Sequence, residues 1–188
     1  MNEAGRTYKS EGIVLKRTNY GEADKIITVF SKHYGKITLL AKGIRRLTSK
    51  KRGNLELFNQ VSFFAHKGKG LDIVTETELL DSFSSWRGDL QKVASVYQIC
   101  EMIDKLTAEG SEQEEIYDLL VTNLKTIAIT GQNNLTILTN SFGVSLLKDL
   151  GFLSRNKVLP QNFNVIAYIE DIIERELKSK KFAGKVRS

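Results

Sequence analysis

The sequence predicts an α+β protein, with a small antiparallel β-barrel in residues 1–80 followed by a small α-helical bundle in residues 81–188. Five short segments rich in β-branched and aromatic residues, separated by turn residues, fill the first part. The connections between them are short, except for the link between the third and the fourth. From residue 81 onward, apolar residues recur at steps of three and four, which is typical of amphipathic helices.

The five predicted strands cover residues 11–17, 25–30, 36–41, 57–65 and 71–79. Turn residues follow the first, second and fourth strands, at Asn19-Tyr20-Gly21, Lys32-His33-Tyr34-Gly35 and Lys67-Gly68-Lys69-Gly70. Five strands with one long third-to-fourth link predict an OB-fold barrel.

Four apolar stripes predict the helices of the second part. The stripes are Leu90, Val93, Ala94, Tyr97, Cys100 and Ile103; Ile116, Leu119, Leu120, Leu124 and Ile127; Leu135, Leu138, Phe142, Leu146 and Leu150; and Val165, Ile169, Ile172, Ile173 and Leu177. Ser111 with Glu114 predicts a capping box, and Gly151 a glycine at the end of the third helix. Residues 155–162, which hold the only proline, are predicted to be a linker. In the last helix the pairs Glu174–Lys178 and Glu176–Lys180 are expected to add support.

The positive charge is concentrated in the predicted barrel. The whole chain has 28 Lys+Arg against 22 Asp+Glu, a net charge of +6; residues 1–80 hold 15 and 8 of these (+7), and residues 81–188 hold 13 and 14 (−1). Six cations fall within eleven positions without an acid, at Lys42, Arg45, Arg46, Lys50, Lys51 and Arg52. Such a cluster favours a polyanionic partner, because neutralised phosphates release counterions. The alternative is a solvated basic loop.

An OB barrel binds nucleic acid through a groove that combines cations with exposed rings. The further cationic candidates are Lys16, Lys25, Lys36, Lys67 and Lys69, and the candidates for stacking on bases are Tyr20, Tyr34, Phe58 and Phe64. A second basic group closes the chain, and it is either a solubilising tail or a secondary DNA contact through Lys178, Lys180 and Lys181. We expect weak sequence preference and strong salt dependence.

The residue pattern favours no catalytic or metal chemistry. Cys100 lies on an apolar stripe, which indicates a buried structural thiol. His33 and His66 have no Cys or His at ligand spacing, and no phosphate-binding loop motif occurs. We therefore expect neither an enzyme nor a cofactor or metal. No apolar run long enough for a membrane span or a signal peptide occurs, so we expect a cytoplasmic protein without a membrane partner.

Several blocks resemble the RecO family of bacterial recombination mediators. They are Glu11-Gly12-Ile13-Val14-Leu15, Tyr20-Gly21-Glu22-Ala23-Asp24, Tyr34-Gly35-Lys36, Ala41-Lys42-Gly43-Ile44-Arg45-Arg46, Gly70-Leu71-Asp72-Ile73, Leu147-Lys148-Asp149-Leu150-Gly151-Phe152 and Arg175-Glu176-Leu177-Lys178-Ser179-Lys180-Lys181-Phe182. The resemblance implies an N-terminal OB domain and a helical C-terminal region. It also implies binding of single- and double-stranded DNA, annealing of complementary strands, and work with RecR to load RecA onto DNA covered by single-strand-binding protein. By position, Lys42 to Arg46 and Lys50 to Arg52 are expected to contact phosphates.

The chain departs from the family pattern after Phe152. Many relatives carry a four-cysteine zinc motif there, whereas residues 153–164 contain no Cys, so we expect a shortened form without this module. In the family, the groove for the acidic, Phe-ended tail of single-strand-binding protein lies in the helical region, and no residues are assigned to it here. Two other functions remain open: an RNA-binding OB protein of the translation apparatus, and an adaptor whose bundle docks an acidic peptide.

Overall fold

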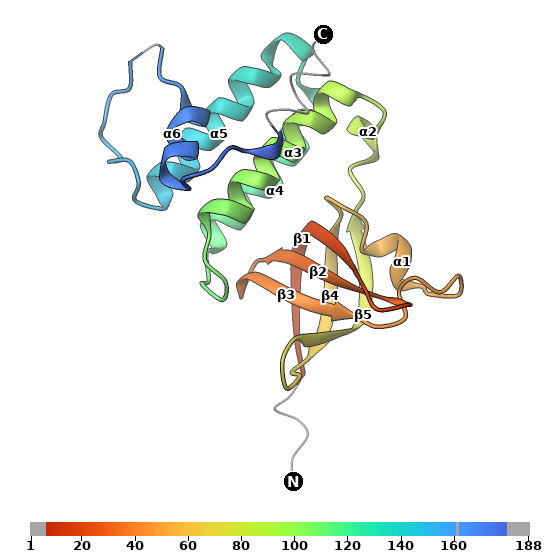
Figure 1. Ribbon diagram of the computed structural model, residues 1–188. Coiled ribbons are helices and arrows are strands. Elements are labelled where there is room, and N and C mark those ends of the chain that lie inside the picture. Colours follow the sequence, from red (N-terminus) through yellow and green to blue (C-terminus); the bar gives the residue numbers. More distant parts are fainter. Residues whose placement is uncertain (1–6, 161, 180–188) are drawn as a thin grey trace. The chain divides into compact units, whose positions relative to one another are not determined.

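The computed structural model describes residues 7–160 and 162–179 (Figure 1). The chain divides into two compact units. One consists of Met1–Ser82 with Ala108–Tyr117, and the other of Phe83–Thr107 with Asp118–Ser188. Each unit is described by itself below.

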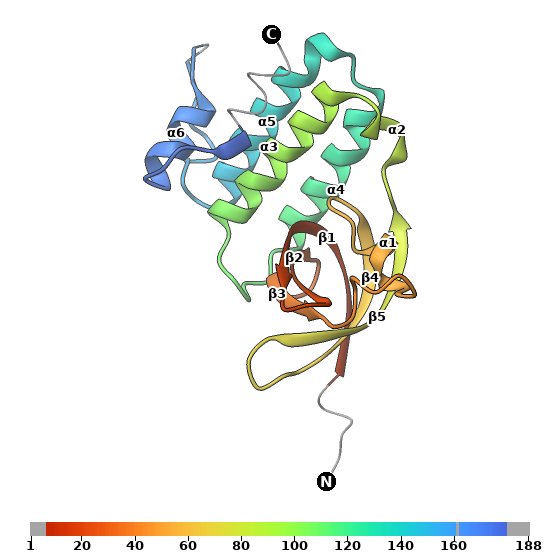
Figure 2. The same ribbon diagram turned by 45° about the vertical axis from the view of Figure 1, so that its right-hand side comes forward.

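The first unit contains a closed five-stranded barrel, which confirms the predicted OB-fold. Its strands are β1 (Thr7–Tyr20), β2 (Asp24–Ser31), β3 (Gly35–Ala41), β4 (Gln60–His66) and β5 (Asp72–Asp81), in the order β1-β2-β3-β5-β4 (Figures 1 and 2). All neighbouring pairs are antiparallel except β3 with β5. The long link between β3 and β4 contains a single turn of helix, α1 (Lys51–Asn54), which packs against β5.

Strand β1 is twice as long as predicted because it closes the barrel. Its first half pairs with β4 and its second half with β2, so this one strand joins the two ends of the sheet and closes it. A register shift between Val14 and Lys16 bends the strand where it changes partner. Gly12 lies where β1 pairs with both β2 and β4. A Cβ added there would lie 2.3 Å from a methyl carbon of Val29, so the close approach of β1 to β2 requires glycine.

The predicted fourth strand begins three residues too early. Residues 57–59 form a turn in which Phe58 has a φ of 68° and its N–H donates to the Val14 carbonyl at 2.8 Å. The buried Asn59 amide donates to the carbonyls of Gly53 and Asn54 at 3.0 and 2.9 Å. These bonds fix the end of the link, and the alternating pattern of residues 57–65 could not reveal them.

The barrel core is apolar and is closed at one end by the link. Its buried residues are Val14, Ile27, Val29, Leu39, Ala41, Ile44, Leu55, Val61, Phe63, Ala65 and Val74. Ile44 and Leu55 belong to the link and not to a strand, so burying them holds the basic segment against the barrel.

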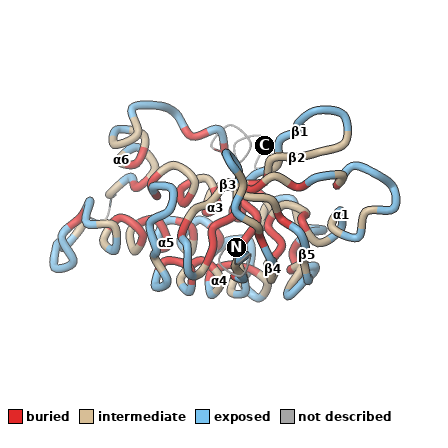
Figure 3. The backbone as a smooth tube through the Cα atoms, turned by 90° about the horizontal axis from the view of Figure 1, so that it is seen from below, coloured by how far each residue is buried: buried red, intermediate tan, exposed pale blue. Residues whose placement is uncertain are grey.

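The second unit is the predicted helical bundle. Its helices are α2 (Ser84–Arg87), α3 (Leu90–Leu106), α4 (Glu114–Ile129), the short 3-10 helix η2 (Gln132–Asn134), α5 (Leu135–Asp149) and α6 (Val165–Ile172); the first turn of α4, up to Tyr117, belongs to the first unit. Helices α3, α4 and α5 lie side by side in both views (Figures 1 and 2). The fully buried Trp86 donates its indole N–H to the Leu124 carbonyl at 3.1 Å and so joins α2 to α4. Buried residues recur at steps of three and four along α5, with exposed or half-buried residues between them (Figure 3).

Cys100 lies in the core of this unit, as predicted, and burial raises the pKa of its thiol. No helix in the described part of the chain is both long and apolar enough to cross a membrane.

The predicted face of α3 is partly wrong. Leu90 and Tyr97 are 65% and 40% exposed, whereas Val96, Ile99 and Met102 are fully buried. Helix α3 packs against both α2 and α5, so its buried face is wider than a single stripe and is rotated away from the predicted one.

The capping box at Ser111 is also wrong, because α4 begins three residues later, at Glu114. Asp89 instead caps α3, where its side chain accepts from the N–H groups of Gln91 and Lys92. Gly151 follows α5 with a φ of 80°, as expected for a terminating glycine.

The last helix ends at Ile172, earlier than predicted. Glu174 has a φ of 53°, and Leu177, although buried, lies beyond the helix end. The predicted helical pair Glu174–Lys178 therefore has no helix to support, and Lys180 lies outside the described residues.

Candidate nucleic-acid interface

The start of the basic link is fastened to the turn between β1 and β2. The Gly43 N–H donates to Asp24 Oδ1 at 2.7 Å, and the Arg45 N–H donates to the Ala23 carbonyl at 2.9 Å. The Arg45 guanidinium also donates to the Gly21 carbonyl at 3.2 Å. The link and the turn therefore form one surface with a fixed backbone.

Beneath this surface, the inner face of the barrel changes from apolar to cationic. Lys25 pairs with Asn19 of β1 on one side and with the buried Ala41 of β3 on the other. Paired residues point to the same face, and Arg17 lies two positions before Asn19 on its strand. Arg17 pairs with the buried Ile27. Arg17 and Lys25 therefore lie on the same inner face as the core residues, nearer to the end of the barrel.

These residues and the link surround an open hollow of about 410 Å³, which we call the cationic pocket. Its lining residues are Arg17, Asn19, Lys25, Ile44, Arg45, Arg52 and Glu56. The Arg17 side chain is only 12% exposed and forms an ion pair with Glu56. Four cations therefore face a single carboxylate, which leaves the pocket strongly positive.

The electrostatics of the pocket favour an anion. The pKa of Lys25 is lowered, first by burial and then by the neighbouring Arg17 charge, and Glu56 offsets this effect only in part. The further cations of the pocket, Arg45 and Arg52, lower this pKa as well. Arg17 Nε is buried without a hydrogen-bond partner. A bound anion would relieve both the charge repulsion and the unpaired donor.

The other link cations divide into two groups. Lys42, Arg46 and Lys50 are exposed beside the pocket-lining Arg45 and Arg52. Lys51 differs, because its ammonium donates to the Val74 carbonyl at 3.2 Å and burial lowers its pKa. Lys51 therefore holds α1 on the barrel and is the least available of the six for a phosphate.

The remaining predicted cations are scattered. Lys16 is exposed on β1, and Lys36 is half-buried on β3. Lys67 and Lys69 are exposed in the turn between β4 and β5, near the N-terminal end of β1 and away from the pocket. Lys178 is exposed in the helical unit, where its N–H donates to Glu101 at 2.9 Å. The two other tail candidates, Lys180 and Lys181, lie outside the described residues.

The candidate stacking rings differ in availability. Tyr20 is 53% exposed at the end of β1, next to the pocket-lining Asn19. Tyr34 packs against Tyr8 with ring centroids 4.6 Å apart, and Phe64 lies under the Lys9 ammonium at 5.4 Å. The fourth candidate, Phe58, is buried and cannot stack on a base, because the turn before β4 directs it into the core.

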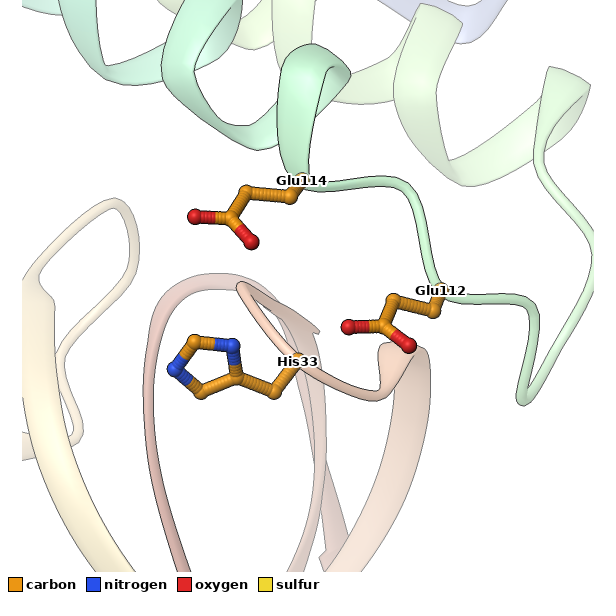
Figure 4. Close-up of side chains that lie close together, drawn as sticks. All are labelled: His33, Glu112 and Glu114. Carbon is orange, nitrogen blue, oxygen red and sulfur yellow. The ribbon is translucent and has the colours of Figure 1, made fainter.

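The structure brings together three side chains that could hold a metal ion. Atoms of His33, Glu112 and Glu114 lie within 4.8 Å of one another (Figure 4). They meet because the Gly110 N–H donates to the Lys36 carbonyl at 2.9 Å, which fastens the β2–β3 turn to the segment before α4. All three are exposed, and Glu114 forms an ion pair with Lys32 at 3.3 Å. Exposed acidic groups of this kind are common without a metal, and the sequence spacing alone did not predict the cluster.

Comparison with known proteins gives the family. A family model for the N-terminal part of recombination protein O matches residues 2–83, and one for its C-terminal part matches residues 87–155. The chain belongs to the RecO family.

Curated relatives agree with this assignment. The DNA repair protein RecO of Roseiflexus sp. (strain RS-1) is 31% identical over 147 residues, which is 78% of this chain and 51% of the relative. The RecO proteins of Pelotomaculum thermopropionicum and Desulforamulus reducens are 33% and 34% identical, over 65% and 76% of this chain and 48% and 54% of theirs. The chain thus spans about half the length of these relatives.

Of the four cations that line the pocket, Lys25, Arg45 and Arg52 were candidates from the sequence and Arg17 was missed. For Lys25 a further signal was available, because it has the same strand parity as the core residues Ile27 and Val29 and is therefore an inward-facing cation. For Arg17 the register shift in β1 obscured the face on which its side chain lies.

Proposed function

We propose that this RecO-family chain binds DNA through the cationic pocket and the exposed cations of the link, and that it anneals complementary strands in recombinational repair. The cationic pocket is the observation that carries this proposal. Four cations around one carboxylate at the end of an OB barrel form a surface that repels cations and attracts phosphates.

Annealing follows from the same electrostatics. Two complementary strands repel each other through their phosphates, and a protein surface rich in cations screens that repulsion while the bases pair. Tyr20, which follows the pocket-lining Asn19 in the chain, offers an exposed ring on which a base can stack. The process needs no bond to be made or broken by the protein, so we propose a mediator and not an enzyme.

The proposed partners rest on membership of the family. We propose that the chain works with RecR and helps to load RecA onto DNA covered by single-strand-binding protein, as the family does. Both single- and double-stranded DNA are proposed substrates, because the pocket and the link read backbone charge and present no set of side chains arranged to read base edges.

A binding titration tests the proposal. A labelled single strand is titrated with the protein at low salt and followed by fluorescence anisotropy, with unlabelled single-stranded DNA, duplex DNA and structured RNA as competitors. We expect the wild-type protein to bind, and Arg45→Glu with Arg52→Glu to abolish most binding. Lys125→Glu with Lys157→Glu is the matched control, because both lysines are exposed in the helical unit.

Each alternative function has its own outcome in this titration. Preferential displacement by structured RNA would favour an RNA-binding protein and contradict the proposal. Absence of DNA binding, together with binding of an acidic Phe-ended peptide that survives the Arg45→Glu/Arg52→Glu change, would favour a peptide adaptor. An equal loss of DNA binding in the control would show that net charge matters and the pocket does not.

A further inference from the structure

We propose that the cationic pocket is a site for the terminal phosphate of a DNA strand, and that the chain thereby distinguishes phosphorylated strand ends from internal backbone. This inference rests on the proposed DNA binding and adds a substrate feature to it. Three properties of the pocket support it: its charge, its shape and an unpaired buried donor.

The charge of the pocket exceeds what an internal phosphate can neutralise. The Arg17 charge is matched by Glu56, which leaves Lys25, Arg45 and Arg52 without an acid among the lining residues. An internal phosphodiester carries one negative charge and two free oxygens. A phosphomonoester carries nearly two charges at pH 7 and three free oxygens, so it matches three cations better.

The shape of the pocket also favours a chain end. Arg17, Asn19 and Lys25 line it from the β1–β2 hairpin, and the other lining residues belong to the link. Ile44, a fully buried residue of the barrel core, lies among the lining residues, so the pocket adjoins the core. An internal phosphate has a sugar on both sides and must pass across such a hollow, whereas a terminal phosphate can enter it. The volume of about 410 Å³ lies within the range of small-molecule sites and accommodates a phosphate together with its terminal sugar.

A buried donor in the pocket lacks an acceptor. Arg17 Nε has no hydrogen-bond partner, although the guanidinium also forms the ion pair with Glu56. An unpaired buried donor is costly, and burying it is explained if a ligand supplies the acceptor. A phosphate oxygen beside Arg17 would do so.

The test compares strands that differ only at their ends. One single-stranded oligonucleotide is prepared with a 5′-phosphate, with a 3′-phosphate and with hydroxyl groups at both ends, and each form competes for the wild-type protein against a labelled strand. We expect at least one phosphorylated form to bind about tenfold more tightly, since a charge-assisted hydrogen bond contributes a factor of this order. The two phosphorylated forms show which end the pocket accepts.

Two variants locate the effect. Lys25→Gln should remove the preference for the phosphorylated end. The matched control, Lys16→Gln, removes an exposed cation from the neighbouring strand β1 that does not line the pocket, and it should keep the preference. Thermal unfolding of each variant shows that it is folded.

The outcomes separate this inference from the proposed function. Equal binding of all three oligonucleotides would overturn the inference and leave the proposed DNA binding intact. Loss of the preference in Lys16→Gln, or its persistence in Lys25→Gln, would also overturn it. No binding of any oligonucleotide would overturn the proposed function itself. Inorganic phosphate, added as the free ion, should displace phosphorylated strands more readily than hydroxyl-ended ones; equal displacement would indicate a general anion effect and contradict the inference.

Discussion

Removing the three arginines of the link should flatten the salt dependence of DNA binding by a calculable amount. Six cations occupy residues 42–52, and Lys51 is held by the Val74 carbonyl, which leaves five for phosphates. On single-stranded DNA each neutralised phosphate contributes about 0.7 to the slope of log K against log[salt], so the wild-type slope should be about −3.5. The variant Arg45→Gln/Arg46→Gln/Arg52→Gln should show a slope of about −1.4.

The assay is an anisotropy titration of a labelled single strand at several salt concentrations. A slope difference of about 2 corresponds to a weakening of several-hundred-fold at 50 mM salt if the two proteins converge near 1 M. The control removes the same charge from exposed residues of the helical unit, by Lys125→Gln, Arg155→Gln and Lys157→Gln. If both variants change the slope equally, or if the arginine variant leaves it unchanged, the link is not the phosphate-contacting surface.

Three further predictions concern folding and electrostatics. Gly35→Ala should lower the free energy of unfolding in urea by more than about 1–3 kcal/mol, because Gly35 has a φ of 59° and a new Cβ would lie 1.8 Å from the Ser111 carbonyl oxygen. The control Gly21→Ala has a similar φ of 55° but open space around the new Cβ, so it should cost clearly less. Equal costs for the two variants would contradict this reasoning. Trp86→Phe should lower stability by about 1–3 kcal/mol, because the smaller ring cannot donate to the Leu124 carbonyl and leaves space at a fully buried site. A change near zero would mean that neither the hydrogen bond nor the packing of the indole contributes. The pKa of Lys25 is lowered in the folded protein, so the folded protein loses this proton at a lower pH than the unfolded chain does. The free energy of unfolding should therefore rise with pH between the lowered pKa and the unfolded value of about 10.4, and this part of the rise should be absent in Lys25→Gln. If the variant and the wild-type protein have the same pH profile, the pocket does not perturb Lys25.

The order and type of the main strands and helices could be predicted because each depends on a pattern within a short stretch of the sequence. Glycine-containing turns and β-branched runs identified all five strands, and helical spacing identified the main helices. What failed depends on partners distant in the chain. The length of β1 follows from pairing with both β2 and β4, and the buried face of α3 follows from packing against both α2 and α5. Strand β2 and helix α2 are near neighbours in the chain, but β4 and α5 lie outside a window of ten or twenty residues.

The candidate site was predictable in its charge and less so in its geometry. The basic link was visible as a run of cations, and the structure brings its Arg45 and Arg52 to one pocket. The contribution of Arg17 was hidden by the register shift in β1, and the role of Lys51 depends on a carbonyl 23 residues away. Phe58 was a reasonable stacking candidate by composition, but its positive φ directs it into the core.

The central claim is that the cationic surface of the barrel brings complementary strands together. Its most direct test is the annealing rate of two complementary oligonucleotides at low salt, followed by fluorescence energy transfer between end labels, with and without single-strand-binding protein on the strands. We predict that the wild-type protein accelerates annealing in both conditions, that the Arg45→Gln/Arg46→Gln/Arg52→Gln variant does not, and that the matched control behaves as wild type. Annealing no faster with the wild-type protein than without it would contradict the claim.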